Sequence, residues 1–445
     1  MKKRRGLALV LAAAAAFAGA QIWIGIWRYD IYRAGVDDGI FTQVVLSAGG
    51  CFCAAAEGWA NHFLVHFSPM LIVGYPFVKA FGDARGLLVL QALLVSTTAF
   101  PLYAIARRYV DDVRAAAIAA VAMIYPVLWA QTFTDFHENA FVPVLSATLV
   151  LFILTRRWRA AGVTALLLLL VKEDQTVMLA LTGILTAIWG ARKDVELRRF
   201  GLLLAAGAVV TGILYFGVIR PAFHSNVPYV ALNFFDWSAS APGTVGAAPA
   251  ERLTYLLLAL VPLVFLPLRS RAVIFAIPGL LEVLASHYHV MLVLQTHYSM
   301  VWSGYMLAAF SDAAANLVAK QPRSGVRALA LACVACALTF RLAHPVALRY
   351  YLYREPDADD ARLARVLSSV PRDATVSGSD EIYAHLAARP GAAPGVLGDY
   401  YVADSKLDDP TWSQRDKAVL DAAVKAGRYR IVYDRFGIIV AKKSR

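Results

Sequence analysis

Residues 2–38 read KKRRGLALVLAAAAAFAGAQIWIGIWRYDIYRAGVDD, and this stretch sets the fold class. Four basic residues precede an apolar run from Leu7 to Trp27, which is long enough to cross a bilayer as a helix. Basic residues favour the cytoplasmic side, so this helix would deliver Asp37 and Asp38 to the external side. A signal peptide cleaved after Ala20 is the alternative, but the apolar run continues past that site, which favours a retained first helix.

The composition extends this interpretation to the whole chain. The protein has 445 residues, of which 59% are hydrophobic and 17% charged, and its mean hydropathy is +0.57. The net charge of +12 comes from short basic groups between apolar runs, a pattern that orients membrane helices and argues against nucleic-acid binding. We predict a mainly α, polytopic membrane protein with about 11 transmembrane helices, at residues 6–27, 85–106, 114–131, 139–155, 160–171, 175–190, 199–219, 253–268, 272–286, 299–318 and 326–344.

The basic groups also predict an orientation. They place the N-terminus in the cytoplasm and the C-terminus outside, with residues 1–345 forming the transmembrane domain. Span 160–171 is short and span 272–286 contains Pro278, so both are candidates for broken helices. Membranes accept broken helices where protein or water covers the freed backbone groups.

Residues 28–84 are predicted to form a long first external loop. A short amphipathic helix from Asp38 to Ala48 should precede membrane-surface helices between Trp59 and Phe81. A further span within this second part is the alternative and would invert everything after it, but the basic pattern argues against it. Cys51 and Cys53 also lie in this loop, and because one intervening residue would strain a disulfide, we expect them to pack.

The composition changes after about Pro345. Charged residues become frequent and the apolar runs shrink to strand length, so we predict that residues 346–445 form a small external soluble α/β domain. Residues 374–377 read as a strand, followed by a helix through Leu386. Residues 429–433 and 437–440 read as two strands joined by a turn.

The clustered acids and the histidines fall on the predicted external side. Asp37 and Asp38 start a helix, and an ordinary N-cap with an acid in the first turn is one explanation, while one of them could instead project into a cavity. His62 and His66 are four residues apart and share one helical face, which suits a metal ion or a phosphate, although interfacial histidines are also ordinary.

Later segments add two more ionisable clusters. Asp135-Phe136-His137-Glu138 precedes a span, where acids are also favoured by the helix dipole. Lys172-Glu173-Asp174 interrupts two apolar runs; a self-neutralising turn is the simpler explanation, but ionisable groups within a membrane are usually functional. His297 and Tyr298 follow another histidine-rich stretch.

These residues fit transfer of a sugar from a lipid-linked donor. Asp37 or Asp38 would remove a proton from the acceptor hydroxyl, and cations would stabilise the departing phosphate. The alternative is a lipid or small-anion transporter or flippase that uses Lys172-Glu173-Asp174 as its binding site or proton relay. A third possibility is an inert anchor that displays the C-terminal domain, but the predicted spans are far more than an anchor needs.

Several ordered motifs also resemble a family of predicted bacterial membrane proteins defined as a domain of unknown function. The motifs that carry this resemblance are Asp37 to Gln43, His62 to Pro69, Asp135-Phe136-His137, Lys172-Glu173-Asp174, His297-Tyr298, Val370 to Val376 and His385 to Arg389. They cover most of the chain. That family is similar to the GT-C superfamily of integral-membrane glycosyltransferases, which implies a GT-C-like architecture in the bacterial cytoplasmic membrane.

The resemblance also implies an activity and a set of site residues. The protein would be an inverting glycosyltransferase that uses a polyprenyl-phosphate sugar and a glycan, lipid or protein acceptor. Asp37 and Asp38 would be catalytic. A divalent metal ion, Mg²⁺ or Mn²⁺, would bind Asp38, Asp135 and His137, although the many histidines depart from the usual pattern and leave metal dependence open. The substrate would contact His62, His66, Asp135, His137, Glu138, Lys172, Glu173, Asp174, His297 and Tyr298.

Overall fold

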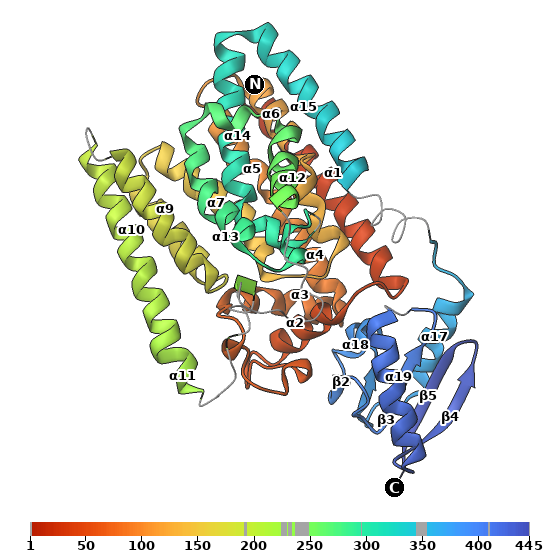
Figure 1. Cartoon of the computed structure of the whole chain (residues 1–445). Coiled ribbons are helices and arrows are strands. Elements are labelled where there is room, and N and C mark those ends of the chain that lie inside the picture. The colour runs from red at the N-terminus through yellow and green to blue at the C-terminus, as the bar shows by residue number, and fades with distance from the viewer. Residues whose placement is uncertain are drawn as a thin grey trace.

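Helices dominate the computed structural model, which describes residues 2–190, 194–223, 229, 234–235, 249–294, 296–343, 354–407 and 410–444. Most of the helices and the turns between them form a bundle (Figure 1). These helices are α1 (Lys2–Asp30), α4 (Arg85–Thr97), α5 (Ala99–Ala106), α6 (Asp112–Met123), α7 (Val142–Leu154), α8 (Trp158–Leu169), α9 (Asp174–Gly190), α10 (Val195–Leu214), α11 (Arg220–Ala222), α12 (Pro249–Leu260), α13 (Ile277–Ala285), α14 (Met300–Lys320) and α15 (Pro322–Ala343).

Each predicted span overlaps helical structure. Four helical stretches among the described residues are long and apolar enough to cross a membrane by themselves, namely Arg5–Asp30, Arg85–Ala106, Val195–Ala222 and Pro322–Arg341. The span predicted at 272–286 is broken as expected, into a 3₁₀ segment (Arg271–Ala276) and α13, which has Pro278 in its first turn. The predicted domain boundary at 345/346 lies outside the described residues.

The first loop contains short helices. The amphipathic helix predicted there is α2 (Val36–Leu46), and residues 59–81 form 3₁₀ turns followed by α3 (Tyr75–Phe81). The stretch Pro69–Phe81 is apolar but shorter than a membrane span. The expectation for the cysteines was wrong, because Cys51 and Cys53 form a disulfide. The Ser47 hydroxyl binds both the N–H and the carbonyl oxygen of Cys53, which folds the chain back at this point.

Helices α9 and α10 pack against each other as an antiparallel pair at one side of the bundle (Figure 1). Their backbones approach closely because the contact consists of small residues: a Cβ on Gly183 would lie 2.6 Å from the carbonyl oxygen of Gly201. Small residues allow this approach where lipid supplies no hydrophobic driving force. The opposite face of α10 is apolar and exposed, as a lipid-facing surface requires. The pair therefore forms one wall beside the turn at residues 170–174.

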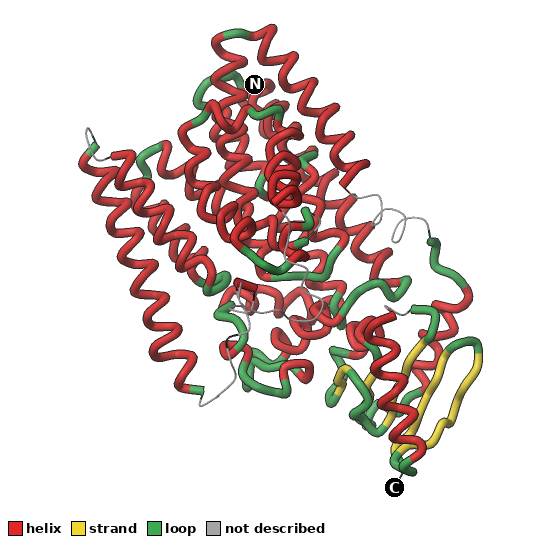
Figure 2. Tube along the Cα trace, in the orientation of Figure 1, coloured by secondary structure: helices red, strands yellow, loops and turns green. Residues whose placement is uncertain are grey.

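The C-terminal part forms a five-stranded sheet with helices against it (Figure 2). The strand order is β2-β1-β3-β5-β4; β1 is parallel to β2 and β3, and β5 is antiparallel to β3 and β4. The elements are α17 (Ala358–Ser369), β1 (Val376–Gly378), α18 (Asp380–Leu386), β2 (Ala392–Pro394), β3 (Tyr400–Asp404), α19 (Pro410–Lys425), β4 (Tyr429–Arg435) and β5 (Ile438–Lys443). The predicted strand–helix unit and the final hairpin are both confirmed.

This domain docks on α2 and on the end of α1 (Figure 1). The Tyr383 hydroxyl donates to Oε1 of Gln43 at 2.7 Å, and Nε2 of Gln43 donates to the carbonyl oxygen of Ala392 at 2.8 Å. The His385 ring is stacked between Tyr29 and Tyr32, at centroid distances of 3.9 and 4.0 Å. The sheet domain therefore packs directly on the helix that carries Asp37 and Asp38.

Candidate functional site

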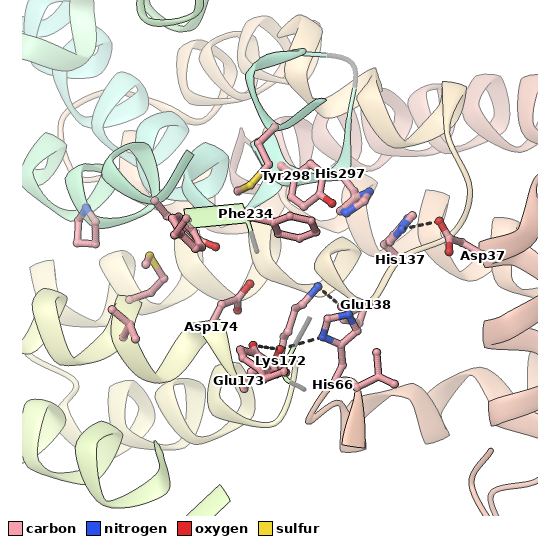
Figure 3. A pocket seen from close by; sticks show the side chains of 18 of the residues that line it. Asp37, His66, His137, Glu138, Lys172, Glu173, Asp174, Phe234, His297 and Tyr298 are labelled. Carbon is pink, nitrogen blue, oxygen red and sulfur yellow. Dashed lines mark hydrogen bonds and ion pairs between the residues drawn. The ribbon is translucent and has the colours of Figure 1, made fainter. Parts of the chain in front are cut away.

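A cavity of about 740 Å³ lies between α2, the turn from α8 to α9, and α13 (Figure 3). One side is polar and the other is apolar, with α9 and α13 supplying Val177, Leu181, Pro278 and Leu281. Ten of the twelve residues predicted for the site line the cavity: Asp37, His62, His66, His137, Glu138, Lys172, Glu173, Asp174, His297 and Tyr298. Asp38 and Asp135 do not.

Asp37 and His137 form an ion pair at the cavity wall (Figure 3). Oδ2 of Asp37 is 3.2 Å from Nε2 of His137, while Nδ1 of His137 is 3.0 Å from the carbonyl oxygen of Asp135. Both ring nitrogens face acceptors, and only an imidazolium can donate to both. Burial opposes the charge, but the hydrogen bond to Asp37 and the carboxylate charge raise the pKa of His137 above 6.5. The same contact outweighs desolvation and lowers the pKa of Asp37.

The Asp37–His137 ion pair predicts that the free energy of unfolding falls at alkaline pH. The pKa of His137 is raised in the folded protein. The contribution of His137 to the free energy of unfolding is therefore complete below about pH 6.5 and disappears as the pH rises through the raised pKa. The wild-type chain should therefore lose more stability between pH 6.5 and 9 than His137→Gln, with a difference in slope of at most about 1.4 kcal/mol per pH unit. Thermal unfolding across this range, with His289→Gln as the control, measures the effect; equal slopes would contradict it.

Asp38 and Asp135 support the site from behind. Oδ1 of Asp38 accepts the N–H of Phe136 at 2.8 Å, and the side chain is fully buried. Asp135 pairs with Arg28 and accepts the N–H groups of Gly35 at 2.9 Å and Asp37 at 3.2 Å, which fixes the start of α2. We expected that either Asp37 or Asp38 could be the base. The structure corrects this expectation, because Asp37 lines the cavity and Asp38 does not. Asp135 likewise has no substrate-facing position.

In the Lys172-Glu173-Asp174 turn, Lys172 and Glu173 contact different segments of the chain (Figure 3). Nζ of Lys172 lies 2.7 Å from Oε1 of Glu138, and the Glu138 side chain is completely buried. Glu173 accepts from Nδ1 of His66 at 2.8 Å, from the N–H of Phe67 at 2.7 Å and from the Tyr229 hydroxyl at 2.5 Å. The sequence also allowed a turn in which Lys172 pairs with the acids beside it. That turn is not formed, since Lys172 pairs with Glu138 in a different segment.

His297 and Tyr298 close the polar side. The His297 ring is stacked on the His137 ring, with centroids 3.4 Å apart, and Tyr298 lies beside it at 4.1 Å. Burial lowers the pKa of His297, and the neighbouring charge of His137 lowers it further. A neutral imidazole therefore stacks on a charged one.

Three ionisable lining residues were missed in the sequence: Glu57, Tyr229 and Glu282. Glu282 had a usable signal, because a single ionisable residue inside an apolar span is costly unless it faces a cavity. Glu57 and Tyr229 had none, since isolated polar residues in loops are ordinary.

The predicted metal ligands do not converge. Asp38, Asp135 and His137 are engaged by backbone and side-chain groups of the protein, as described above. Within the described residues, no group of three or more His, Cys, Asp or Glu side chains is arranged to hold a metal ion. A cation would therefore need water or substrate to complete its coordination.

The overall fold has a counterpart among solved structures. A helical bundle with a small C-terminal sheet domain is a GT-C-like fold. The structure of ArnT from Cupriavidus metallidurans, bound to undecaprenyl phosphate, is similar with a TM-score of 0.57 and 13% sequence identity. The alignment covers 96% of this chain and 97% of that one, so the likeness extends over the whole fold.

The sequence itself gives the family. The chain belongs to the family described as predicted membrane protein (DUF2079), whose model matches residues 28–440. None of the curated proteins compared with it matches.

Proposed function

We propose that this protein is a GT-C-type glycosyltransferase that moves a sugar from a polyprenyl-phosphate donor to an acceptor at the external face of the bacterial cytoplasmic membrane. The observation that carries the proposal is the divided cavity. Its polar side gathers ionisable groups from at least five segments, and its apolar side is continuous with exposed residues of α9 and α13.

The two sides suit the two parts of a polyprenyl-phosphate sugar. Val177, Leu181 and Leu281 line the cavity and are also exposed, so a prenyl chain could enter from the lipid without crossing polar groups. Lys172 lies on the polar side, where an ammonium group can face the phosphate. The undecaprenyl phosphate bound to ArnT supports the donor class, because that protein has a similar fold.

Asp37 is the best-placed base. Its side chain is 42% exposed although its partner His137 is nearly buried, so the carboxylate is accessible from the cavity. In the proposed step, the carboxylate takes the proton of an acceptor hydroxyl as that oxygen bonds to the anomeric carbon. The bond between the anomeric carbon and the phosphate oxygen breaks, and polyprenyl phosphate leaves with the bonding electron pair. Attack opposite the leaving group inverts the anomeric centre.

A transfer assay tests the function directly. Vesicles with the purified chain receive several polyprenyl-phosphate sugars, each labelled in the sugar, together with an envelope extract as acceptor. We expect the label of one donor to move to an acceptor while an equal amount of polyprenyl phosphate is released. Label that crosses the bilayer while still attached to its lipid would indicate a flippase and overturn the proposal.

A further inference from the structure

The turn from His62 to His66 presents two imidazoles on one side. The N–H of His66 donates to the carbonyl oxygen of His62 at 2.8 Å, and the Asn61 side chain caps the turn by accepting the N–H of Phe63 at 2.9 Å. The Tyr215 hydroxyl holds the carbonyl oxygen of Phe63 at 2.9 Å. Both histidines line the cavity, so the turn is a rigid support for groups that face it.

Each imidazole is held at Nδ1 by a carboxylate. Nδ1 of His62 lies 2.8 and 3.0 Å from the two oxygens of Glu57, and Nδ1 of His66 lies 2.8 Å from Oε1 of Glu173. A carboxylate at Nδ1 fixes the hydrogen there and directs the lone pair of a neutral ring to Nε2. This is the arrangement in which proteins hold metal-ligating histidines, since it orients the ring and increases its basicity.

The outer nitrogen of His62 has no hydrogen-bond partner among the described residues. The residue is only 1% exposed, and Nε2 is buried. The rings of Phe41 and Phe52 lie at its edges, with centroids 5.9 and 5.8 Å away, and offer no partner of ordinary strength. A buried polar atom without a partner is destabilising, so its presence in a residue that lines the cavity points to a ligand.

The spacing of the two rings fits a shared ion. A zinc ion lies about 2.1 Å from a ligating imidazole nitrogen, and therefore roughly 3.2 Å from the ring centre. Two rings that share one tetrahedral ion have centres roughly 5.2 Å apart, and a wider angle at the ion increases this distance toward roughly 6.4 Å. The centroids of His62 and His66 are 5.9 Å apart, with the rings inclined by 67°.

The charges around the cavity favour a cation. Five acidic side chains line its polar side, against Lys172 and the imidazolium of His137; they are Asp37, Glu57, Glu138, Glu173 and Asp174. An anionic phosphate would be repelled by this excess unless another positive charge were present. A divalent ion supplies two charges at one point.

We propose that His62 and His66 bind one divalent cation through their Nε2 atoms, with Zn²⁺ the best match to two nitrogen ligands. Glu57 and Glu173 orient the rings without touching the ion. Water fills the remaining coordination positions, and, in the part that rests on the proposed function, a phosphate oxygen of the donor replaces one water. Such an open position is typical of catalytic rather than structural zinc.

Zinc binding tests the site without any sugar donor. The full chain, purified without a polyhistidine tag and stripped with a chelator, is titrated with Zn²⁺, and the bound metal is counted by elemental analysis. We expect one ion per wild-type chain. His62→Gln and His66→Gln should each weaken binding at least tenfold, and Glu57→Gln should weaken it by about 10–100-fold, as loss of an orienting partner does elsewhere. His289→Gln, which changes an exposed histidine paired with Glu251, is the matched control.

A second measurement separates loss of the site from loss of the fold. Co²⁺ in place of Zn²⁺ should give visible absorption bands that change in His66→Gln, while the unfolding temperature of the metal-free variant stays near that of the wild type. Absence of stoichiometric binding in the wild type, or unchanged binding in both histidine variants, would overturn the proposal. Zinc binding without sugar transfer would refute the proposed function and leave the metal site standing.

Discussion

Replacing Asp37 with Asn should lower sugar transfer by about 100-fold or more, since a general base contributes about 10²–10⁴ in rate. The amide cannot take a proton at neutral pH, but it has nearly the same shape. Its oxygen can still accept from Nε2 of His137, which lies 3.2 Å from the carboxylate in the wild type. The variant should therefore fold and bind the donor while failing in the chemical step.

The matched control is Asp30→Asn. Asp30 ends α1, is not among the residues that line the cavity, is half-exposed, and lies 3.9 Å from Arg85. It should keep wild-type transfer in the same vesicles. If Asp37→Asn retains more than about a tenth of the wild-type rate, a general-base role for Asp37 is excluded.

Replacing Lys172 with Met should have the largest effect on stability. It leaves the fully buried carboxylate of Glu138 without its cation, and breaking a buried pair in this way costs about 3–5 kcal/mol. The single variant should unfold at a clearly lower temperature in detergent than the wild type. Glu138→Gln combined with Lys172→Met removes both charges and should recover most of the loss.

The double variant also separates structure from function. It should fold but bind polyprenyl phosphate weakly, because the ammonium group that would face the phosphate is gone. Binding can be followed by the rise in unfolding temperature on adding undecaprenyl phosphate, with polyprenol, which has no phosphate, as the control ligand. An equal rise in the double variant and the wild type would remove Lys172 from the phosphate site.

The sequence predicted the positions of the elements better than their interactions. Hydrophobic periodicity and the basic groups located the helical segments because length and polarity are local properties. The β4–β5 hairpin was also predictable, since its turn and alternating residues are adjacent.

Hydrogen-bond and ion-pair partners that are distant in the sequence could not be predicted from local patterns. Asp135 was predicted to face substrate, but it pairs with Arg28, 107 residues away. His62 and His66 were correctly expected on one face. Their carboxylate partners, Glu57 and Glu173, could not be predicted, because these contacts depend on the fold of the loop and on the placement of the α8–α9 turn. Ion pairs of this kind require the tertiary structure, and no local pattern contains it.

The docking of the sheet domain on α2 couples two parts of the molecule thermodynamically. Gln43, six residues after Asp37 on α2, hydrogen-bonds Tyr383 and Ala392 of the sheet domain and also accepts the N–H of Ala55. Any molecule that binds the sheet domain more tightly in its docked than in its undocked state must stabilise this end of α2. By reciprocity, a substrate that orders α2 must tighten that second binding event by the same factor.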